Sequence, residues 1–159
     1  MKVIGIVGEY NPFHFGHAYH IEESRKAAGE DSAVVCVMSG DFVQRGEAAL
    51  YSKFARAEAA CRSGADLVLE LPCAFTLRSA EFFAQGGVSL LAASGCVNAL
   101  CCGVESADCD FPALARIACD ASVQEQLQAL LRQGTSYASA WEQLFAAHSE
   151  KLEKPLSSP

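Results

Sequence analysis

One stretch near the start of the chain decides the fold: Lys2-Val3-Ile4-Gly5-Ile6-Val7-Gly8-Glu9-Tyr10-Asn11-Pro12-Phe13-His14-Phe15-Gly16-His17. Residues 2–7 are apolar and rich in β-branched side chains, which predicts a buried parallel strand. The pattern turns helical from His17, and residues 18–28 are predicted as a helix that Gly29 stops. A His-x-Gly-His motif therefore lies where a strand ends and a helix begins. Open α/β sheets bind ligands at this edge, outside the carboxyl ends of their strands.

The two histidines of this motif, His14 and His17, suit chemistry on phosphates. Nucleotidyl transfer builds negative charge on the α-phosphate and the leaving pyrophosphate, and imidazoles can donate hydrogen bonds to those oxygens. Gly16 has no Cβ, so a phosphate or a base can approach the backbone, and the start of a helix favours the same anion. Two ordinary loop histidines, or a metal-binding pair, are the alternatives for an isolated motif. The position directly after an N-terminal strand favours the phosphate role.

Composition and charge narrow the class of protein. The chain has 159 residues, of which 51% are apolar, enough for a folded domain with a core. Its net charge of -7 argues against general affinity for nucleic acid, which needs Lys and Arg. The eight cysteines form no Cys-x-x-Cys and none is close in sequence to a histidine, which predicts no zinc site and a reduced, cytoplasmic protein. The sequence has no signal region and no apolar span of membrane length.

Further apolar runs continue the alternation of strands and helices. Residues 33–38, 66–71 and 97–102 are predicted as strands. A helix capped by Ser79 is predicted to run through Leu91, where the glycines at 86 and 87 indicate close packing. Strand, helix and strand in sequence form a right-handed βαβ unit, so we expect an α/β fold with a parallel sheet flanked by helices.

A second loop, residues 39–47, also follows a predicted strand and should face the same crevice. Within it, Arg45 can pair with a phosphate or a carboxylate; an ordinary surface loop with a solvated arginine is an equal alternative. Ser52 can cap a helix that runs to Arg62, with Lys53 and Arg56 on its outer face, where they reach a phosphate or lie in water. The inner face of this helix is predicted to hold Phe54, Ala57 and Cys61.

The rest of the chain is predicted to be helical. Ser122 and Glu125 fit a capping box for one helix, and a later face carries Tyr137, Trp141, Leu144 and His148, which we interpret as a packing surface. The sequence thus predicts a core over residues 1–109, a helical extension over 110–153 that packs on it, and a linker or truncation point over 154–159.

Together these residues make the chain similar to the bacterial tRNA(Met) cytidine acetate ligase family, a branch of the HIGH-type nucleotidyltransferase superfamily. The resemblance rests on residues 8–17, 39–47, 66–72, 79–80 and 102–105, in the family's order. The second of these motifs is the most specific, because generic adenylyltransferases lack it.

The resemblance implies a Rossmann-like nucleotidyltransferase fold and an ATP-dependent ligase. Family members activate acetate with ATP to acetyl-adenylate and release pyrophosphate. They then pass the acetyl group to N4 of the wobble cytidine of elongator tRNA(Met). The expected partners are ATP with Mg2+, acetate, and tRNA(Met). No metal cluster bound by the protein and no contact with a membrane are expected.

The resemblance also carries site residues onto this chain. His14 and His17 would stabilise the phosphates. Arg45 is a further catalytic candidate by our own inference, on the acetate or the phosphate side. Four more residues, from the second loop and the helix after it, are candidates for contact with substrate or phosphate: Asp41, Gln44, Lys53 and Arg56. ATP would be bound by Val7, Gly8, Glu9, Tyr10, Asn11, Pro12, Phe13, His14, Phe15, Gly16, His17, Ala18, Tyr19, His20 and Gly103.

The chain departs from the family pattern in three ways. Phe15 is bulky where the family often has Asn or Leu, and Val104 replaces a usual Ser. Family members also continue past this point into a Pro-Asn-x-Ile-Leu-Gly segment and a further region, so we expect a truncated catalytic portion whose tRNA-binding surface lies elsewhere. The alternatives are a small-molecule adenylyltransferase acting on a phosphorylated substrate, and a nucleotide-binding module that is inactive on its own.

Overall fold

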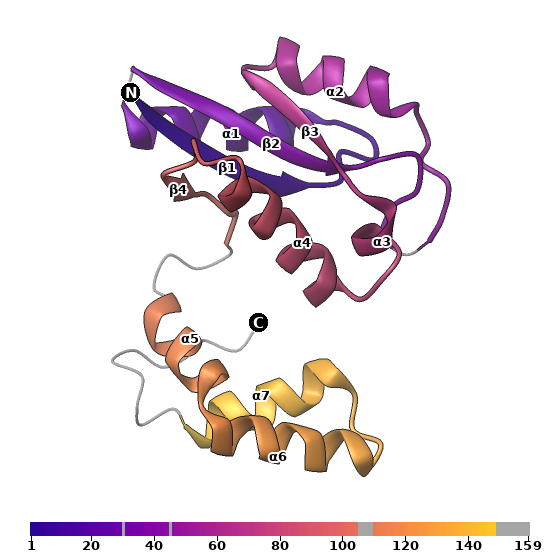
Figure 1. The fold of residues 1–159 in the computed structure, drawn as a ribbon, viewed down its shortest axis with the longest axis vertical. Helices are drawn as coiled ribbons and strands as arrows, with labels where there is room; N and C mark the ends of the chain where they lie inside the picture. The colour runs from indigo at the N-terminus through magenta and orange to yellow at the C-terminus, as the bar shows by residue number, and fades with distance from the viewer. Residues whose placement is uncertain (30, 45, 105–109, 149–159) are drawn as a thin grey trace. The chain divides into compact units, whose positions relative to one another are not determined.

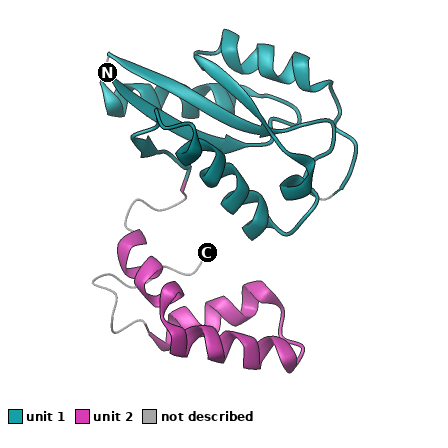
Figure 2. Ribbon diagram, viewed as in Figure 1, with its two compact units in different colours: residues 1–103 teal, residues 104–159 magenta. Residues whose placement is uncertain are grey.

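A computed structural model describes residues 1–29, 31–44, 46–104 and 110–148 (Figure 1). The chain divides into two compact units, residues 1–103 and residues 104–159 (Figure 2). The sequence predicts a boundary after residue 109, and residues 105–109 lie outside the described part, as do 149–159. The predicted packing of the helical region on the core stays a prediction.

The first unit is built on a parallel sheet with the strand order β3-β2-β1-β4. Its strands are β1 (Lys2–Gly8), β2 (Ser32–Ser39), β3 (Leu67–Leu71) and β4 (Ala99–Leu100). This confirms the predicted α/β fold. The strand predicted over residues 97–102 is shorter than expected, although Asn98 N donates to Val3 O at 2.8 Å and Cys101 N donates to Gly5 O at 2.9 Å. Single hydrogen bonds thus continue the pairing at both ends of β4.

Helices cover both faces of this sheet, as Figure 1 shows for α1 and α4. The helices of the unit are α1 (Phe15–Ala28), α2 (Lys53–Arg62), α3 (Cys73–Thr76) and α4 (Ala80–Ala93). Alternate residues of β2 point to opposite faces: Cys36 packs with residues of α1 and α2, whereas Val37 packs with residues of α4. The result is a three-layer sandwich with one apolar cluster on each side of the sheet.

Helix α4 approaches the sheet closely, as its paired glycines predict. A Cβ on Gly87 would lie 2.6 Å from the Val7 side chain, and a Cβ on Gly86 would lie 2.5 Å from Phe75. Ser79 occupies the N-cap position but makes no capping hydrogen bond with its side chain. The short helix α3, which supplies Phe75, has no counterpart among the predicted elements, because four residues show no helical period.

The predicted inner face of α2 is wrong. Phe54 is 77% exposed and Cys61 is exposed, whereas Ala60 and Arg56 are buried. Only Ala57 packs partly against the core, as expected. The apolar pattern misled the prediction because an arginine occupies an inward position, where its guanidinium finds polar partners.

The second unit is helical, with α5 (Phe111–Cys119), α6 (Ala121–Arg132) and α7 (Tyr137–Ala147) around their own apolar cluster. Trp141 stacks on Phe145 at 5.0 Å, and both pack against this cluster, which agrees with the predicted packing surface. The predicted capping box of Ser122 and Glu125 is wrong. Asp120 is the N-cap of α6, because its Oδ1 accepts from Ser122 N at 2.9 Å.

The described residues bear on three features that the sequence predicts to be absent: a disulfide, a metal site and a membrane-spanning helix. Every cysteine among them is a free thiol. They contain no group of three or more His, Cys, Asp or Glu side chains placed to hold a metal ion. No helix in this part of the chain is long and apolar enough to cross a membrane.

Candidate functional site

The two motif histidines form a reciprocal cap at the start of α1. His14 is the N-cap residue, and its Nδ1 accepts from Gly16 N at 3.1 Å. In return, His17 Nδ1 accepts from His14 N at 3.2 Å. The helix therefore begins at Phe15, earlier than the helical pattern predicts. Capping by side-chain acceptors is a local property of the sequence, and here imidazoles perform it.

These contacts determine which ring nitrogen carries the proton. A backbone N–H can only donate, so Nδ1 of His14 and Nδ1 of His17 are both unprotonated, and each neutral ring keeps its proton on Nε2. The two rings stack with centroids 3.7 Å apart. Burial, followed by the charges of His14 and His20, lowers the pKa of His17. The arrangement thus presents two neutral Nε2–H donors side by side.

Aromatic side chains pack against His17. Tyr10 is 2% exposed, and its ring lies 5.0 Å from the His17 ring at an edge-on angle of 71°. The Phe13 ring lies 5.4 Å from His17 and 5.1 Å from Tyr10. Burial raises the pKa of Tyr10, so its hydroxyl stays protonated. Tyr10 also has a positive φ of 53°, which turns the chain sharply after β1.

The start of α1 is suited to an anion. No acidic residue lies in its first turn, so no carboxylate of that turn competes with an anion for the positive end of the helix dipole. Phe15 is 94% exposed and points to solvent, so its bulk does not separate the stacked histidines. The remaining residues of the predicted ATP stretch lie at the end of β1, in the loop, and in the first turns of α1, where Tyr19 is 65% exposed.

His20 lies one turn beyond the histidine pair. Its Nε2 is buried and has no hydrogen-bond partner among the described residues. Burial lowers its pKa. Gly103, predicted to touch the nucleotide, follows β4, which is the neighbour of β1 in the sheet. A Cβ there would meet no atom of the described residues within 4 Å. Val104 is 49% exposed.

In the structure the second loop extends over residues 40–52, between β2 and α2, and two hydrogen bonds attach it to the first loop (residues 9–14). Gln44 N donates to Glu9 Oε1 at 2.5 Å, and Leu50 N donates to Asn11 Oδ1 at 2.7 Å. The second loop also closes on itself, since Ala49 N donates to Asp41 O at 2.9 Å. The structure thus brings together the two loops that the sequence assigns to one crevice.

Of the residues predicted on the second loop, Arg45 lies outside the described residues, and its role stays a prediction. Gln44 Nε2 donates to Arg78 O at 3.3 Å. Asp41 is exposed and lies 3.6 Å from Lys53 Nζ. These contacts are with the protein's own groups.

Lys53 is paired with a residue that the sequence reasoning missed. Its Nζ lies 2.8 Å from Glu70 Oε2, and the hydrogen bond to Glu70 raises the pKa of Lys53. A Cβ on Gly40 would clash with Glu70 Oε1, so the carboxylate rests directly on the backbone of the second loop. The signal that could have identified Glu70 in the sequence is its position as a lone acidic residue inside the apolar run 67–71.

Arg56 is not on an outer face, as predicted, but is 2% exposed. Its Nη1 donates to Glu9 O at 2.6 Å and to Ser39 Oγ at 3.3 Å. Its Nη2 donates to Ser39 O at 3.1 Å and to Gly40 O, and its Nε donates to Tyr51 O at 3.2 Å. The pKa of Arg56 is lowered by burial, while the carboxylates of Asp41, Glu9 and Glu70 act in the opposite direction. All five N–H donors of the guanidinium are thus hydrogen-bonded within the protein.

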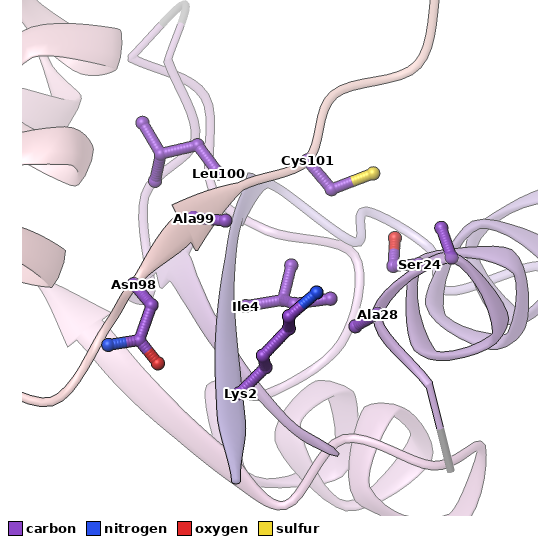
Figure 3. A pocket seen from close by; sticks show the side chains of 9 residues that line it. Lys2, Ile4, Ser24, Ala28, Asn98, Ala99, Leu100 and Cys101 are labelled. Carbon is purple, nitrogen blue, oxygen red and sulfur yellow. The ribbon is translucent and has the colours of Figure 1, made fainter. Parts of the chain in front are cut away.

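A separate cavity of about 310 Å³ lies away from the histidines (Figure 3). It is lined by Lys2 and Ile4 of β1, by Ser24 and Ala28 of α1, and by the chain around β4. Lys2 begins β1 and Ala28 ends α1, so the cavity lies at the opposite ends of both elements from the loop that joins them. Another cavity, of about 180 Å³, is lined by Gly40, Asp41 and Glu70 among others, beside the second loop.

A parallel sheet whose first strand leads through a His-x-Gly-His cap into the first helix places the chain in the class of α/β proteins that carry their ligand-binding edge at the ends of the strands. A family model described as HIGH Nucleotidyl Transferase matches residues 1–159, and the chain belongs to this family.

Curated relatives carry a more specific name. The tRNA(Met) cytidine acetate ligase of Acetivibrio thermocellus is 45% identical over 99% of this chain and 39% of its own length. That of Syntrophotalea carbinolica is 47% identical over 100% of this chain, and again 39% of its own length is covered. The chain therefore spans about two fifths of the curated relatives it matches.

A solved structure agrees with both the fold and the name. The crystal structure of Thermotoga maritima TmcAL bound with alpha-thio ATP matches with a TM-score of 0.78 and 40% sequence identity. The match covers 97% of this chain and 40% of that chain.

Proposed function

We propose that this chain carries the adenylation site of a tRNA(Met) cytidine acetate ligase. The observation that carries the proposal is the reciprocal cap of His14 and His17, which occupies both Nδ1 atoms and leaves Nε2–H as the donor of each stacked ring at the start of α1. The names of the similar proteins, and the alpha-thio ATP bound to the Thermotoga maritima protein, support the same substrate.

In the proposed reaction, a carboxylate oxygen of acetate attacks the α-phosphorus of ATP. The bond between the α-phosphorus and the bridging oxygen breaks, and pyrophosphate leaves. The Nε2–H groups of His14 and His17 donate to phosphate oxygens as charge develops on them. The N4 amine of the cytidine then attacks the carbonyl carbon of acetyl-adenylate, so that AMP leaves and the acetylated base remains.

We propose positions for the other substrates from the charge of the chain and from the residues beside the histidines. Mg2+ would accompany the phosphates of ATP, since it keeps most of its waters and needs few protein ligands. Arg45 and the second loop are proposed to face the acetate or the phosphates. With a net charge of -7, this chain is not expected to supply the main tRNA surface. The proposed reaction belongs in the cytoplasm, where tRNA is modified.

The experiment that tests this proposal measures exchange of labelled pyrophosphate into ATP, with and without acetate, alongside a titration of ATP binding. We expect ATP binding and acetate-dependent exchange, and His17→Ala should suppress the exchange while the far-UV circular dichroism stays unchanged. Exchange that requires a phosphorylated small molecule instead of acetate would favour an adenylyltransferase. ATP binding without any exchange would leave the chain as a nucleotide-binding module, and no ATP binding would refute all three.

A further inference from the structure

Arg56 is a buried cation with no carboxylate partner among its described hydrogen bonds. The side chain is 2% exposed, and an arginine has five N–H donors in a fixed planar fork. Its five acceptors are one hydroxyl, Ser39 Oγ, and the backbone carbonyls of Glu9, Ser39, Gly40 and Tyr51. Each donor therefore has its own acceptor, so the guanidinium is satisfied without a free N–H for a ligand.

These acceptors come from three places that the sheet brings together. Glu9 lies in the first loop, directly before Tyr10. Ser39 ends β2 and Gly40 begins the second loop, while Tyr51 lies near the end of that loop. A single side chain thus holds both ends of the second loop and also the first loop.

The contact between Arg56 and the Glu9 carbonyl connects the guanidinium to the histidine pair through Tyr10. The Glu9 carbonyl is fixed by Arg56 Nη1 at 2.6 Å, and the next residue, Tyr10, packs its ring 5.0 Å from His17. The Glu9 carboxylate also accepts from Gln44 N of the second loop. Glu9 is therefore held through its backbone by Arg56 and joins the two loops through its side chain.

We propose that Arg56 is a positioning residue, whose guanidinium fork clamps both ends of the second loop against the first and thereby keeps that loop in register with the nucleotide site. The inference rests on the proposed function only for its consequence on ATP binding. The clamp itself requires planar geometry, since no other side chain presents five donors in one rigid plane. A lysine keeps the charge but offers three donors on one atom.

Hydrogen exchange at backbone amides distinguishes this role from a general contribution to stability. In Arg56→Met and Arg56→Lys, we expect the Gln44 and Leu50 amides to exchange at least tenfold faster, while the amides of β1 and β2 keep their wild-type protection. ATP affinity should fall about tenfold or more in the same variants. Arg56→Lys retains the charge and serves as the test if Arg56→Met does not fold.

The matched control is Arg62→Met on the same helix, where the arginine side chain is 79% exposed and pairs with Glu58. It should change neither exchange nor ATP affinity. The proposal is overturned if Arg56→Lys keeps wild-type exchange at Gln44 and Leu50, or if exchange rises equally in the strands and the loop. If the wild-type chain does not bind ATP but the selective exchange is observed, the clamp stands and the proposed function fails.

Discussion

The first and second loops differ in what holds their functional groups in place. Where the first loop enters α1, the imidazoles of His14 and His17 are fixed by backbone N–H groups within four residues of sequence. The second loop closes on itself, and its described contacts with the first loop include hydrogen bonds to Glu9 and Asn11, which lie more than thirty residues away in sequence. The comparison teaches that the imidazole donors, which we propose face the phosphates, are positioned locally by the sequence, whereas the position of the second loop depends on the folded sheet.

The largest effect is expected from removing the local donors. His14→Ala and His17→Ala should each lower ATP affinity about tenfold to a hundredfold, since a hydrogen bond to a charged group contributes about 1.5–3 kcal/mol. Titration of ATP binding measures the loss. His148→Ala, at the end of α7 in the other unit, is the control and should bind ATP as the wild type does. Unchanged affinity in both motif variants would remove the histidines from the site.

The next prediction tests whether the second loop depends on the first loop for its position while the first does not depend on the second. Glu9→Ala removes the acceptor of Gln44 N, so the Gln44 amide should exchange with solvent about tenfold faster, because a lost hydrogen bond to a charged carboxylate is worth about 1.5 kcal/mol. Glu9→Gln keeps a carbonyl acceptor and should stay near the wild-type rate. His14→Ala should leave the Gln44 amide protected. Equal deprotection in His14→Ala would show that the first loop is not independent.

A packing change probes how closely the second loop rests on the sheet. Gly40→Ala would drive a Cβ into Glu70 Oε1, which is the end of a flexible side chain, so Glu70 should rotate away from Lys53 and the free energy of unfolding should fall by no more than about 1 kcal/mol. Urea denaturation measures this loss. Gly103→Ala, in open space, is the control for stability. A loss of several kcal/mol in Gly40→Ala would mean that Glu70 cannot move aside.

The histidine cap should also make stability depend on pH. The pKa of His17 is lowered in the folded chain, so the unfolded chain binds more protons as the pH falls below about 6.5. Stability should therefore be fully present above that pH and decrease as the pH falls through the folded pKa, where protonated Nδ1 can no longer accept. Urea midpoints between pH 7 and pH 5 should fall less in His17→Asn. His20, whose pKa is also lowered, leaves the remaining slope.

The smallest effect is expected at Phe15. Its side chain is 94% exposed, so Phe15→Asn should change the free energy of unfolding by no more than about 0.5 kcal/mol. Thermal melts of the two chains measure it. A loss of several kcal/mol would show that the phenyl ring supports the cap, contrary to the stacked rings of His14 and His17.

Much of the fold could be predicted because its signals are local. The apolar run 2–7, the similar run 33–38 and the strand before Pro72 are continuous in sequence, as buried parallel strands are. The histidine motif was found for the same reason, since its four residues form one cap.

The rest could not be predicted because its partners are distant in sequence. Arg56 was assigned to solvent because a charged residue usually lies outside, and its acceptors at Glu9 and Ser39 are brought together only by the sheet. Glu70 pairs with Lys53 across 17 residues of sequence. The cap of α6 was misplaced because Asp120, which also ends α5, outcompetes Ser122.

The central claim is that His14 and His17 present Nε2–H donors to a nucleotide. Long-range nitrogen–proton NMR of the imidazole rings, at pH 7.5 with and without a non-hydrolysable ATP analogue, tests it directly. We predict that both rings carry the proton on Nε2 in the free chain and that both Nε2 resonances shift when the analogue binds. Protons on Nδ1 in the free chain, or Nε2 chemical shifts that stay unchanged when the analogue binds, would contradict the account.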